Sequence, residues 1–402
     1  MLTPSAIPDT FTFLDYDFDY VNAAAHFHYL GADNTQYHEE INFKKPERDY
    51  NHQVLDRALF LAFILIGTSY YKSHPTQNIF LIDNIDKNQA TFFTTVYQEG
   101  LSQFAYENHL TRQNLATFKE AGDYTAEPPL DYTGKGKIVL ESGGKDSLLT
   151  ATLLSEKNED FTPVYVSTTG KYPKVLDELG KKPTIITRKI DIKNLKKAKG
   201  LNGHIPATYI IQTLALIQAI LDNKNEVITS IGQEGIEPAT KLGDLEINHQ
   251  WSKTPAAEKL YNDYLHKYIS KNLSVKSPLR DYTELEIAEQ FAKKCWAKFG
   301  EKFSSCNIAN YKQGEINEEL SWCGKCPKCA NSYLLFCPFI PAKEQQKLFN
   351  GRDLFPDPDL TETFKGLLGY DGIMKPFECV GTIEELRKAY NNKLKGYGEI
   401  NG

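Results

Sequence analysis

Residues 137–147 read KIVLESGGKDS, an apolar run that leads directly into two glycines and then into a helical pattern. Gly143 and Gly144 allow the backbone to turn sharply and to approach a phosphate group without a Cβ in the way. The amides at the start of the following helix, together with its dipole, would face an anion. We therefore interpret the stretch as a strand, a phosphate-binding loop and a helix. The alternative is a turn whose glycines only end the strand.

The polar side chains of this loop suit a nucleotide. Ser142 and Ser147 are hydroxyl donors, Lys145 supplies a positive charge, and Asp146 is a candidate contact for Mg²⁺. The spacing differs from that of the Walker loop, which reads GxxxxGK[ST]. Residues 142–147 are therefore predicted to bind ATP in a loop of a different type.

Strand and helix patterns alternate around the loop, which is typical of a parallel sheet with helices on both faces. Strands are predicted at residues 137–141, 162–167, 184–190 and 226–231, and helices at 146–155, 174–179 and 204–221. The fold class is α/β with a doubly wound parallel sheet. We predict an N-terminal α+β domain over residues 1–130, a nucleotide-binding domain over 131–300, and a cysteine-rich helical region over 301–402.

The composition is that of an ordinary globular chain. The 402 residues are 41% hydrophobic and 24% charged, and the net charge of −6 gives no overall attraction to nucleic acid. The N-terminus lacks the pattern of a secretory signal. The longest apolar run, residues 58–66, is shorter than the roughly 18 residues that cross a bilayer, and it is better explained by a core helix. We expect a cytoplasmic enzyme for a small molecule, without membrane insertion or a nucleic-acid partner; the oligomeric state stays open.

Four of the seven cysteines form the pattern of a metal site. Cys323, Cys326 and Cys329 are spaced C-x2-C-x2-C, and Cys306 offers a fourth thiol. Four thiolates satisfy a tetrahedral Zn²⁺ with no open position, which predicts a structural zinc site. Iron–sulfur ligation and four buried, unligated cysteines are the alternatives.

The loop and the cysteines resemble known families. SGGKDS at residues 142–147 is similar to the SGGxDS signature of the PP-loop ATP pyrophosphatases. That resemblance implies cleavage of ATP between its α- and β-phosphates, with release of pyrophosphate and adenylation of a substrate oxygen. A loop of this type followed by four cysteines resembles 7-cyano-7-deazaguanine synthase, which is shorter and has nothing like the first 130 residues of this chain.

A resemblance that covers almost the whole chain is to the UDP-N-acetylmuramoyl-L-alanyl-L-glutamate epimerases. The segments that carry it are residues 66–72, 99–108, 203–206, 248–253, 305–329 and 375–381. It implies an ATP-dependent isomerase of peptidoglycan biosynthesis that adenylates the terminal L-glutamate carboxylate of a UDP-muramoyl dipeptide and then inverts Cα.

The residues themselves are compatible with such chemistry. A free carboxylate resists loss of the Cα proton because its charge opposes the carbanion, and adenylation removes that charge. Proton removal and return need acid/base groups near Cα. The candidates are His204, His249, Glu378 and Cys379. His249 is the first choice because a neutral imidazole accepts and returns protons near pH 7; each candidate could instead be structural.

Substrate contacts are predicted in two of the family-like segments, and Lys72 and Lys253 suit a polyanionic UDP-sugar. The candidates are Tyr71, Lys72, Asn248, Gln250 and Lys253. Three other functions remain open: an amidating ligase of the deazaguanine type, a tRNA-thiolating enzyme and a non-catalytic ATP sensor. The acidic balance argues against the tRNA enzyme, and the intact loop argues against the sensor.

Overall fold

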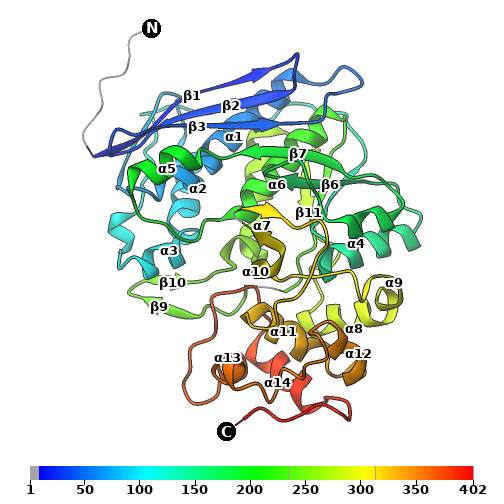
Figure 1. Cartoon of the computed structure of the whole chain (residues 1–402). Helices are drawn as coiled ribbons and strands as arrows, with labels where there is room; N and C mark the ends of the chain where they lie inside the picture. Colours follow the sequence, from blue (N-terminus) through cyan, green and yellow to red (C-terminus); the bar gives the residue numbers. More distant parts are fainter. Residues whose placement is uncertain (1–8, 234, 313, 402) are drawn as a thin grey trace.

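One nine-stranded sheet runs through the upper part of the molecule in the order β11-β8-β5-β6-β7-β3-β2-β1-β4 (Figure 1). The computed structural model describes residues 9–233, 235–312 and 314–401. Five neighbouring strands are parallel. They are β5 (Lys137–Leu140), β6 (Thr162–Ser167), β7 (Thr184–Lys189), β8 (Glu226–Ile228) and β11 (Ser274–Lys276). The α/β prediction is therefore confirmed.

The parallel half is doubly wound. The chain passes from β5 outward through β6 and β7, then returns to β8 beside β5 and ends at β11. The strand order thus reverses between β5 and β8, and ligands of such sheets bind outside the carboxyl ends of the strands at this reversal. The glycine loop directly follows β5, so the topology places it at this position.

The other strands come from the N-terminal region, for which the sequence predicts an α+β domain without locating its strands. They are β1 (Thr10–Asp19), β2 (Ala24–Leu30), β3 (Gln36–Asn42) and β4 (Asn78–Leu81). Strands β1 to β3 form an antiparallel meander, and β3 pairs antiparallel with β7. The N-terminal region and the parallel half therefore share one sheet and one hydrophobic core, while the domain boundary near residue 130 stays a prediction.

Two apolar helices fill the core beneath this sheet. Helix α1 (His52–Tyr71) is long and apolar enough to span a membrane, but 83% of its most apolar window is buried inside the protein. The prediction of a core helix here is confirmed. Helix α6 (Ala207–Leu221) begins three residues later than predicted, because Pro206 disfavours helical backbone at the residue before it. His204 therefore lies in a loop.

The remaining elements complete the layers around the sheet. Helices are α2 (Lys87–Glu99), α3 (Ser102–Glu107), α4 (Lys145–Glu156), α5 (Ile192–Ala198), α7 (Pro255–Tyr264), α8 (Glu284–Lys294), α9 (Trp296–Phe299), α10 (Asn307–Asn310), α11 (Pro327–Phe336), α12 (Ala342–Lys347), α13 (Thr361–Leu368) and α14 (Ile383–Asn391). Two short hairpins are formed by β9 (Thr240–Leu242) with β10 (Leu245–Ile247), and by β12 (Tyr311–Lys312) with β13 (Glu315–Ile316). The short helix predicted at residues 174–179 is a 3₁₀ helix.

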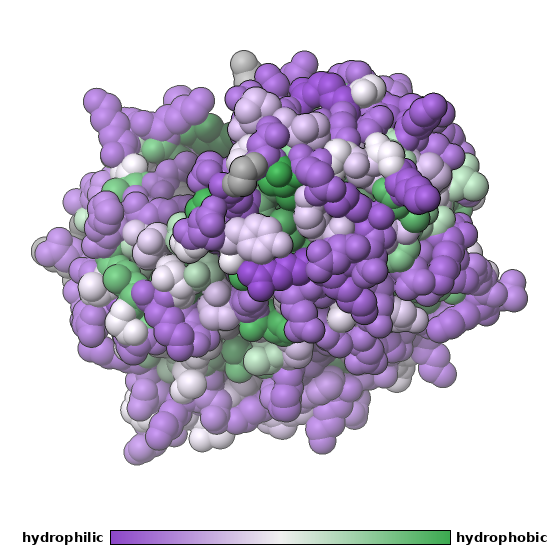
Figure 2. Space-filling model, turned by 90° about the horizontal axis from the view of Figure 1, so that it is seen from below, coloured by the Kyte–Doolittle hydropathy of each residue, from purple (hydrophilic) through white to green (hydrophobic). Residues whose placement is uncertain are grey.

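The C-terminal helices pack below the parallel half (Figure 1). Helices α8, α11, α13 and α14 surround a second hydrophobic core, which also includes Leu148 and Leu149 of α4. The helix that carries the glycine loop is thereby fixed against the C-terminal region. The lower face of the molecule is mainly hydrophilic, with apolar residues in small separate patches (Figure 2).

Candidate active site

The glycine loop has the geometry that its sequence predicts. Gly143 has φ of +78°, and a Cβ at this position would lie 2.7 Å from Cδ1 of Leu320 and 2.9 Å from Cγ1 of Val175. Only glycine fits both the backbone conformation and the available space. Gly144 caps α4, which starts at Lys145, so the amide end of this helix faces the loop.

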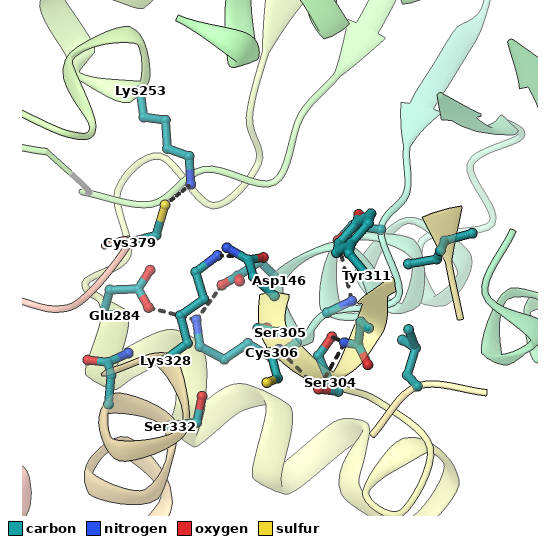
Figure 3. Close-up of a pocket in the computed structure, with 18 residues that line it drawn as sticks. Asp146, Lys253, Glu284, Ser304, Ser305, Cys306, Tyr311, Lys328, Ser332 and Cys379 are labelled. Carbon is teal, nitrogen blue, oxygen red and sulfur yellow. Dashed lines mark hydrogen bonds and ion pairs between the residues drawn. The ribbon is translucent and has the colours of Figure 1, made fainter. Parts of the chain in front are cut away.

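A cavity of about 200 Å³ lies against this loop (Figure 3). Its lining comes from the glycine loop, the segment around Lys253, the start of α8, residues 304–311, Ile316, Leu320, the first turns of α11 and the segment before α14. The predicted site residues that line it are Ser142, Gly144, Lys145, Asp146, Lys253, Cys306 and Cys379. The fold therefore brings the predicted nucleotide loop together with one acid/base candidate.

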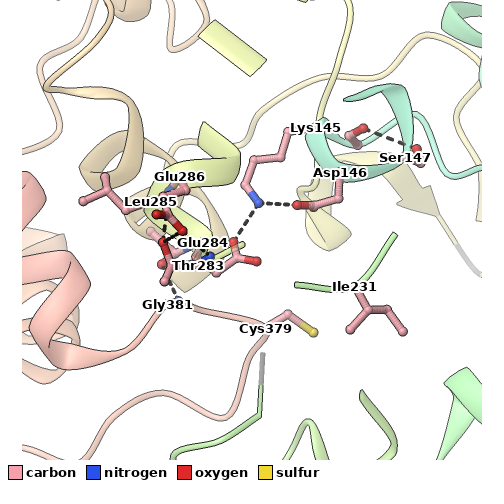
Figure 4. Close-up of polar contacts among 12 residues, drawn as sticks. Lys145, Asp146, Ser147, Ile231, Thr283, Glu284, Leu285, Glu286, Cys379 and Gly381 are labelled. Atoms are coloured by element: carbon pink, nitrogen blue, oxygen red, sulfur yellow. Dashed lines mark hydrogen bonds and ion pairs between the residues drawn. The ribbon is translucent and has the colours of Figure 1, made fainter. Parts of the chain in front are cut away.

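Lys145 is buried and lies between two carboxylates (Figure 4). Its Nζ is 2.6 Å from Oδ1 of Asp146 and 2.7 Å from Oε2 of Glu284. Burial disfavours the ammonium, but the two carboxylates outweigh burial and raise the pKa of Lys145 above its usual value. Its positive charge is therefore retained at the wall of the cavity.

Sequence reasoning missed two charged residues of this cavity, Glu284 and Lys328. Glu284 is the first residue of α8, whose start is marked by the capping box of Thr283 and Glu286. The capping box predicts where the helix starts, but no local sequence pattern predicts that this start faces the cavity. Lys328 lies in the first turn of α11, with its Nζ 3.8 Å from Oε2 of Glu378. Lys328, Lys145 and Lys253 therefore all line the cavity, and their three ammonium groups suit a polyanion.

The four predicted metal-binding cysteines converge within 4.8 Å of one another. The Sγ atoms of Cys306 and Cys326 are 3.7 Å apart, as are those of Cys323 and Cys329, and the Cys326–Cys329 distance is 3.5 Å. A tetrahedral zinc ion with Zn–S bonds of about 2.3 Å requires sulfurs about 3.8 Å apart. The thiols therefore fit a single ion, whereas an iron–sulfur cage would separate them further.

Backbone amides surround these sulfurs. The amide of Ala309 donates to Cys306 Sγ, that of Gly324 to Cys329 Sγ, and that of Lys325 to Cys323 Sγ, over 3.3–3.4 Å. Such hydrogen bonds orient metal-binding thiolates. The cluster also adjoins the cavity, because Cys306 lines it and Cys326 caps α11, which carries Lys328.

The acid/base candidates occupy three different places. Cys379 lines the cavity and accepts a hydrogen bond from Nζ of Lys253 over 3.3 Å (Figure 3). Glu378 points to Lys328. The rings of His204 and His249 lie together, with centroids 4.4 Å apart, and His249 Nδ1 is 2.6 Å from Oε1 of Gln103. The histidines do not contribute to the described lining of the cavity.

Both histidines are neutral at physiological pH. The pKa of His249 is lowered to about 4, chiefly by burial; Glu378 opposes this shift, and the cations of Lys253 and Lys328 add to it. Burial and the neighbouring His249 lower the pKa of His204 to about 3. The two neutral imidazoles can accept protons, but burial makes their protonated forms unfavourable.

The predicted substrate contacts are mostly engaged within the protein. Tyr71 is fully buried and donates to the carbonyl of Thr76, and a substrate contact at this residue stays a prediction. Lys72 Nζ donates to the carbonyl of Gly203 over 3.0 Å, next to His204.

Two further candidates belong to the segment that leads into Lys253. Asn248 donates to the carbonyl of Gly235 over 2.6 Å. Gln250 is buried and donates to the carbonyl of Val380 over 3.4 Å. Of the five predicted substrate contacts, only Lys253 lines the cavity.

Comparison with known proteins covers both halves of the chain. Residues 3–277 match the family described as the MurL N-terminal domain, and residues 302–396 match the MurL C-terminal domain. The chain is 33% identical over 388 residues to the UDP-N-acetyl-alpha-D-muramoyl-L-alanyl-L-glutamate epimerase of Salinispora tropica, covering 94% of this chain and 83% of that protein. Proteins of the same name from a Micromonospora species and from Xanthomonas oryzae pv. oryzae are each 32% identical, over 94% and 84% of this chain and 85% and 75% of their own lengths. With both domain matches and this extent of identity, the chain belongs to the MurL family of UDP-N-acetyl-alpha-D-muramoyl-L-alanyl-L-glutamate epimerases.

Proposed function

We propose that this protein inverts the terminal L-glutamate of UDP-N-acetylmuramoyl-L-alanyl-L-glutamate to D-glutamate, using ATP, in cytoplasmic synthesis of peptidoglycan precursors. The names of its relatives support the isomerase activity and the substrate. The observation that carries the mechanism is a single cavity in which Lys145 and Asp146 of the glycine loop lie together with Lys253 and Cys379.

ATP is the group that supplies activation, since transfer of its adenylyl group to the glutamate carboxylate cancels the charge that opposes carbanion formation. The amides at the start of α4 and the ammonium groups of Lys145 and Lys328 would hold its phosphates. Asp146 would hold Mg²⁺, which would balance phosphate charge. The hydroxyls of Ser142 and Ser147, whose oxygens are 3.3 Å apart, keep the loop compact.

The four cysteines would hold a structural zinc ion. All four positions of a tetrahedral ion are filled by thiolates, so the ion offers no site for substrate. Its contribution would be to join residues 304–307 to the start of α11, two walls of the cavity that are far apart in sequence.

The test is to incubate the protein with ATP, Mg²⁺ and UDP-N-acetylmuramoyl-L-alanyl-L-glutamate. We expect stoichiometric AMP and pyrophosphate, and D-glutamate after acid hydrolysis of the product. Asp146→Asn should lose both activities. Release of ADP would contradict the type of loop, and ammonia-dependent formation of an amide would support the ligase alternative instead.

A further inference from the structure

Two residues of the cavity form a thiol–amine pair whose position suits proton transfer. Lys253 ends the short 3₁₀ helix Trp251–Lys253, and Cys379 lies in the segment that leads to α14. Their side-chain atoms, Nζ and Sγ, are 3.3 Å apart although the residues are 126 positions apart in sequence. Both line the cavity that contains Lys145 and Asp146 of the glycine loop.

The surrounding structure holds both members of this pair in place. Gln250 Nε2 donates to the carbonyl of Val380, so the two segments are joined a second time beside the Lys253–Cys379 contact. Arg280 donates to the carbonyl of Lys253 over 2.9 Å and forms an ion pair with Glu258 over 2.7 Å. The pair is therefore built on backbone that is fixed from two sides.

The chemistry of inversion needs what this pair offers. One group must remove the Cα proton, and another must deliver a proton to the opposite face of the same carbon. The histidine pair is outside the described lining of the cavity, and Glu378 faces Lys328. Of the four acid/base candidates, Cys379 is the one that shares the cavity with the nucleotide loop.

We propose that Cys379 and Lys253 are the two proton-transfer groups of the epimerisation. This inference rests on the proposed function and names the catalytic residues of its second step. Activated Cα enters between the sulfur and the ammonium, which separate to admit it. In one direction, the Cys379 thiolate takes the Cα proton, and the electron pair moves onto the adjacent acyl group as an enolate.

The Lys253 ammonium then delivers a proton to the other face of Cα, and the electron pair returns to form the new C–H bond. This leaves a thiol and a neutral amine. When the product departs, the thiol passes its proton to the amine across the Sγ–Nζ contact, which restores the thiolate and the ammonium. No net proton is gained or lost, and the reverse direction uses the same groups in the opposite order.

The experiment follows solvent deuterium into Cα with each epimer in turn, in the presence of ATP and Mg²⁺, at saturating substrate. Loss of a general base costs on the order of 10² to 10⁴ in rate. Cys379→Ala and Lys253→Met should each lose inversion by such a factor and still release pyrophosphate. Each variant retains one of the two proton-transfer groups and can therefore still exchange the Cα hydrogen on one face. Each should exchange the hydrogen of one epimer with retention of configuration. The epimer that exchanges should be opposite in the two variants.

Two matched variants serve as controls. Cys295→Ala removes a buried thiol that contacts Thr152 outside the cavity, and Lys259→Met removes an exposed lysine of α7. Both should invert the substrate at the wild-type rate. Pyrophosphate release by the Cys379 and Lys253 variants shows that their nucleotide site is folded. Cys379→Ser provides a second, smaller change at position 379.

Several outcomes would overturn the proposal. The first is that Cys379→Ala or Lys253→Met still inverts the substrate. The second is that a higher substrate concentration restores inversion in Lys253→Met. The third is that both variants lose exchange of the Cα hydrogen in both epimers. If His249→Asn lost exchange of the Cα hydrogen while the Cys379 and Lys253 variants kept it, proton transfer would be assigned to the histidine pair. If the wild-type protein released pyrophosphate without inverting the substrate, the proposed function itself would fail, and this result is separate from any result on the pair.

Discussion

At the scale of single residues, the two neutral, buried histidines His204 and His249 make stability depend on pH. An unfolded chain protonates a histidine below about pH 6.5, whereas the folded protein leaves His249 neutral down to about pH 4 and His204 to about pH 3. The unfolded state therefore binds more protons in this window, so stability falls as the pH is lowered through it. The slope is about 1.4 kcal/mol per pH unit for each group.

We predict that His204→Asn with His249→Asn flattens this dependence between pH 6.5 and pH 4. The measurement is the free energy of unfolding in urea at several pH values. An equally steep decline in the double variant would show that the two imidazoles are protonated in the folded protein.

The residues of the site differ in how far their positions could be inferred from sequence. Gly143 and Gly144 follow a strand and Lys145 begins a helix, so their placement depends on local hydrogen bonds and was predicted. Glu284 faces Lys145 across 139 positions, and no periodicity or turn signal encodes that contact. The roles of the acid/base candidates stay predictions, since only their placement follows from the structure.

At the scale of elements, the turn between β5 and α4 depends on the absence of a side chain at Gly143. We predict that Gly143→Ala reduces ATP binding and pyrophosphate release strongly, because its Cβ would collide with Leu320 and Val175. Gly170 is a matched control, since its φ of +86° is similar but no atom lies within 4 Å of its would-be Cβ.

The measurement is nucleotide affinity by calorimetry for Gly143→Ala and Gly170→Ala. Both variants should lose stability from the unfavourable backbone conformation, and Gly143→Ala should lose more because its Cβ also meets Leu320 and Val175. Only Gly143→Ala should lose affinity. Equal affinity in the two variants would mean that the loop tolerates displacement by the extra methyl group.

The cysteine cluster joins the loop before α10 to the start of α11. We predict about one zinc ion per chain, and partial or complete loss of this ion in Cys326→Ser, because removing one of four ligands opens the tetrahedron. Metal binding at such sites is coupled to folding, so the melting temperature should fall as well. Metal analysis and thermal unfolding provide the two readouts.

Pyrophosphate release in Cys326→Ser should also fall, since Cys306 and Lys328 line the cavity on either side of the cluster. Cys337→Ser is a suitable comparison, because Cys337 is equally buried but lies at the end of α11 away from the cluster. Its metal content should stay at the wild-type value. Full metal content in Cys326→Ser would contradict the four-thiol assignment.

At the scale of the whole molecule, a buried ion pair joins the N-terminal strands to the parallel half of the sheet. Arg188 of β7 contacts Glu39 of β3 over 2.5 Å and also donates to Ser69 of α1. Tyr70 of α1 donates to the same carboxylate over 2.7 Å. This network lies where the antiparallel β3–β7 pairing makes two regions into one sheet.

We predict that Arg188→Met destabilises the protein by about 3–5 kcal/mol, because it leaves the Glu39 carboxylate buried without its cation. Lys189→Met removes an exposed partner of Glu40 on the same two strands and should cost less than about 1 kcal/mol. Urea unfolding measures both. Because one core spans both regions, each variant should still unfold in one transition; separate transitions would indicate two independent domains.

The sequence by itself determined the features that depend on near neighbours in the chain. These are the strand–loop–helix at residues 137–156, the alternation that gives a parallel sheet, the buried helix α1 and the spacing of three cysteines. They follow from local hydrogen bonding and from the periodicity of burial, both of which are written in a few consecutive residues. Only the tertiary structure decided that β3 joins β7, that Glu284 and Lys328 enter the cavity, and that Lys253 meets Cys379. Such contacts form between distant segments and are fixed by how apolar faces pack, so no local pattern specifies them.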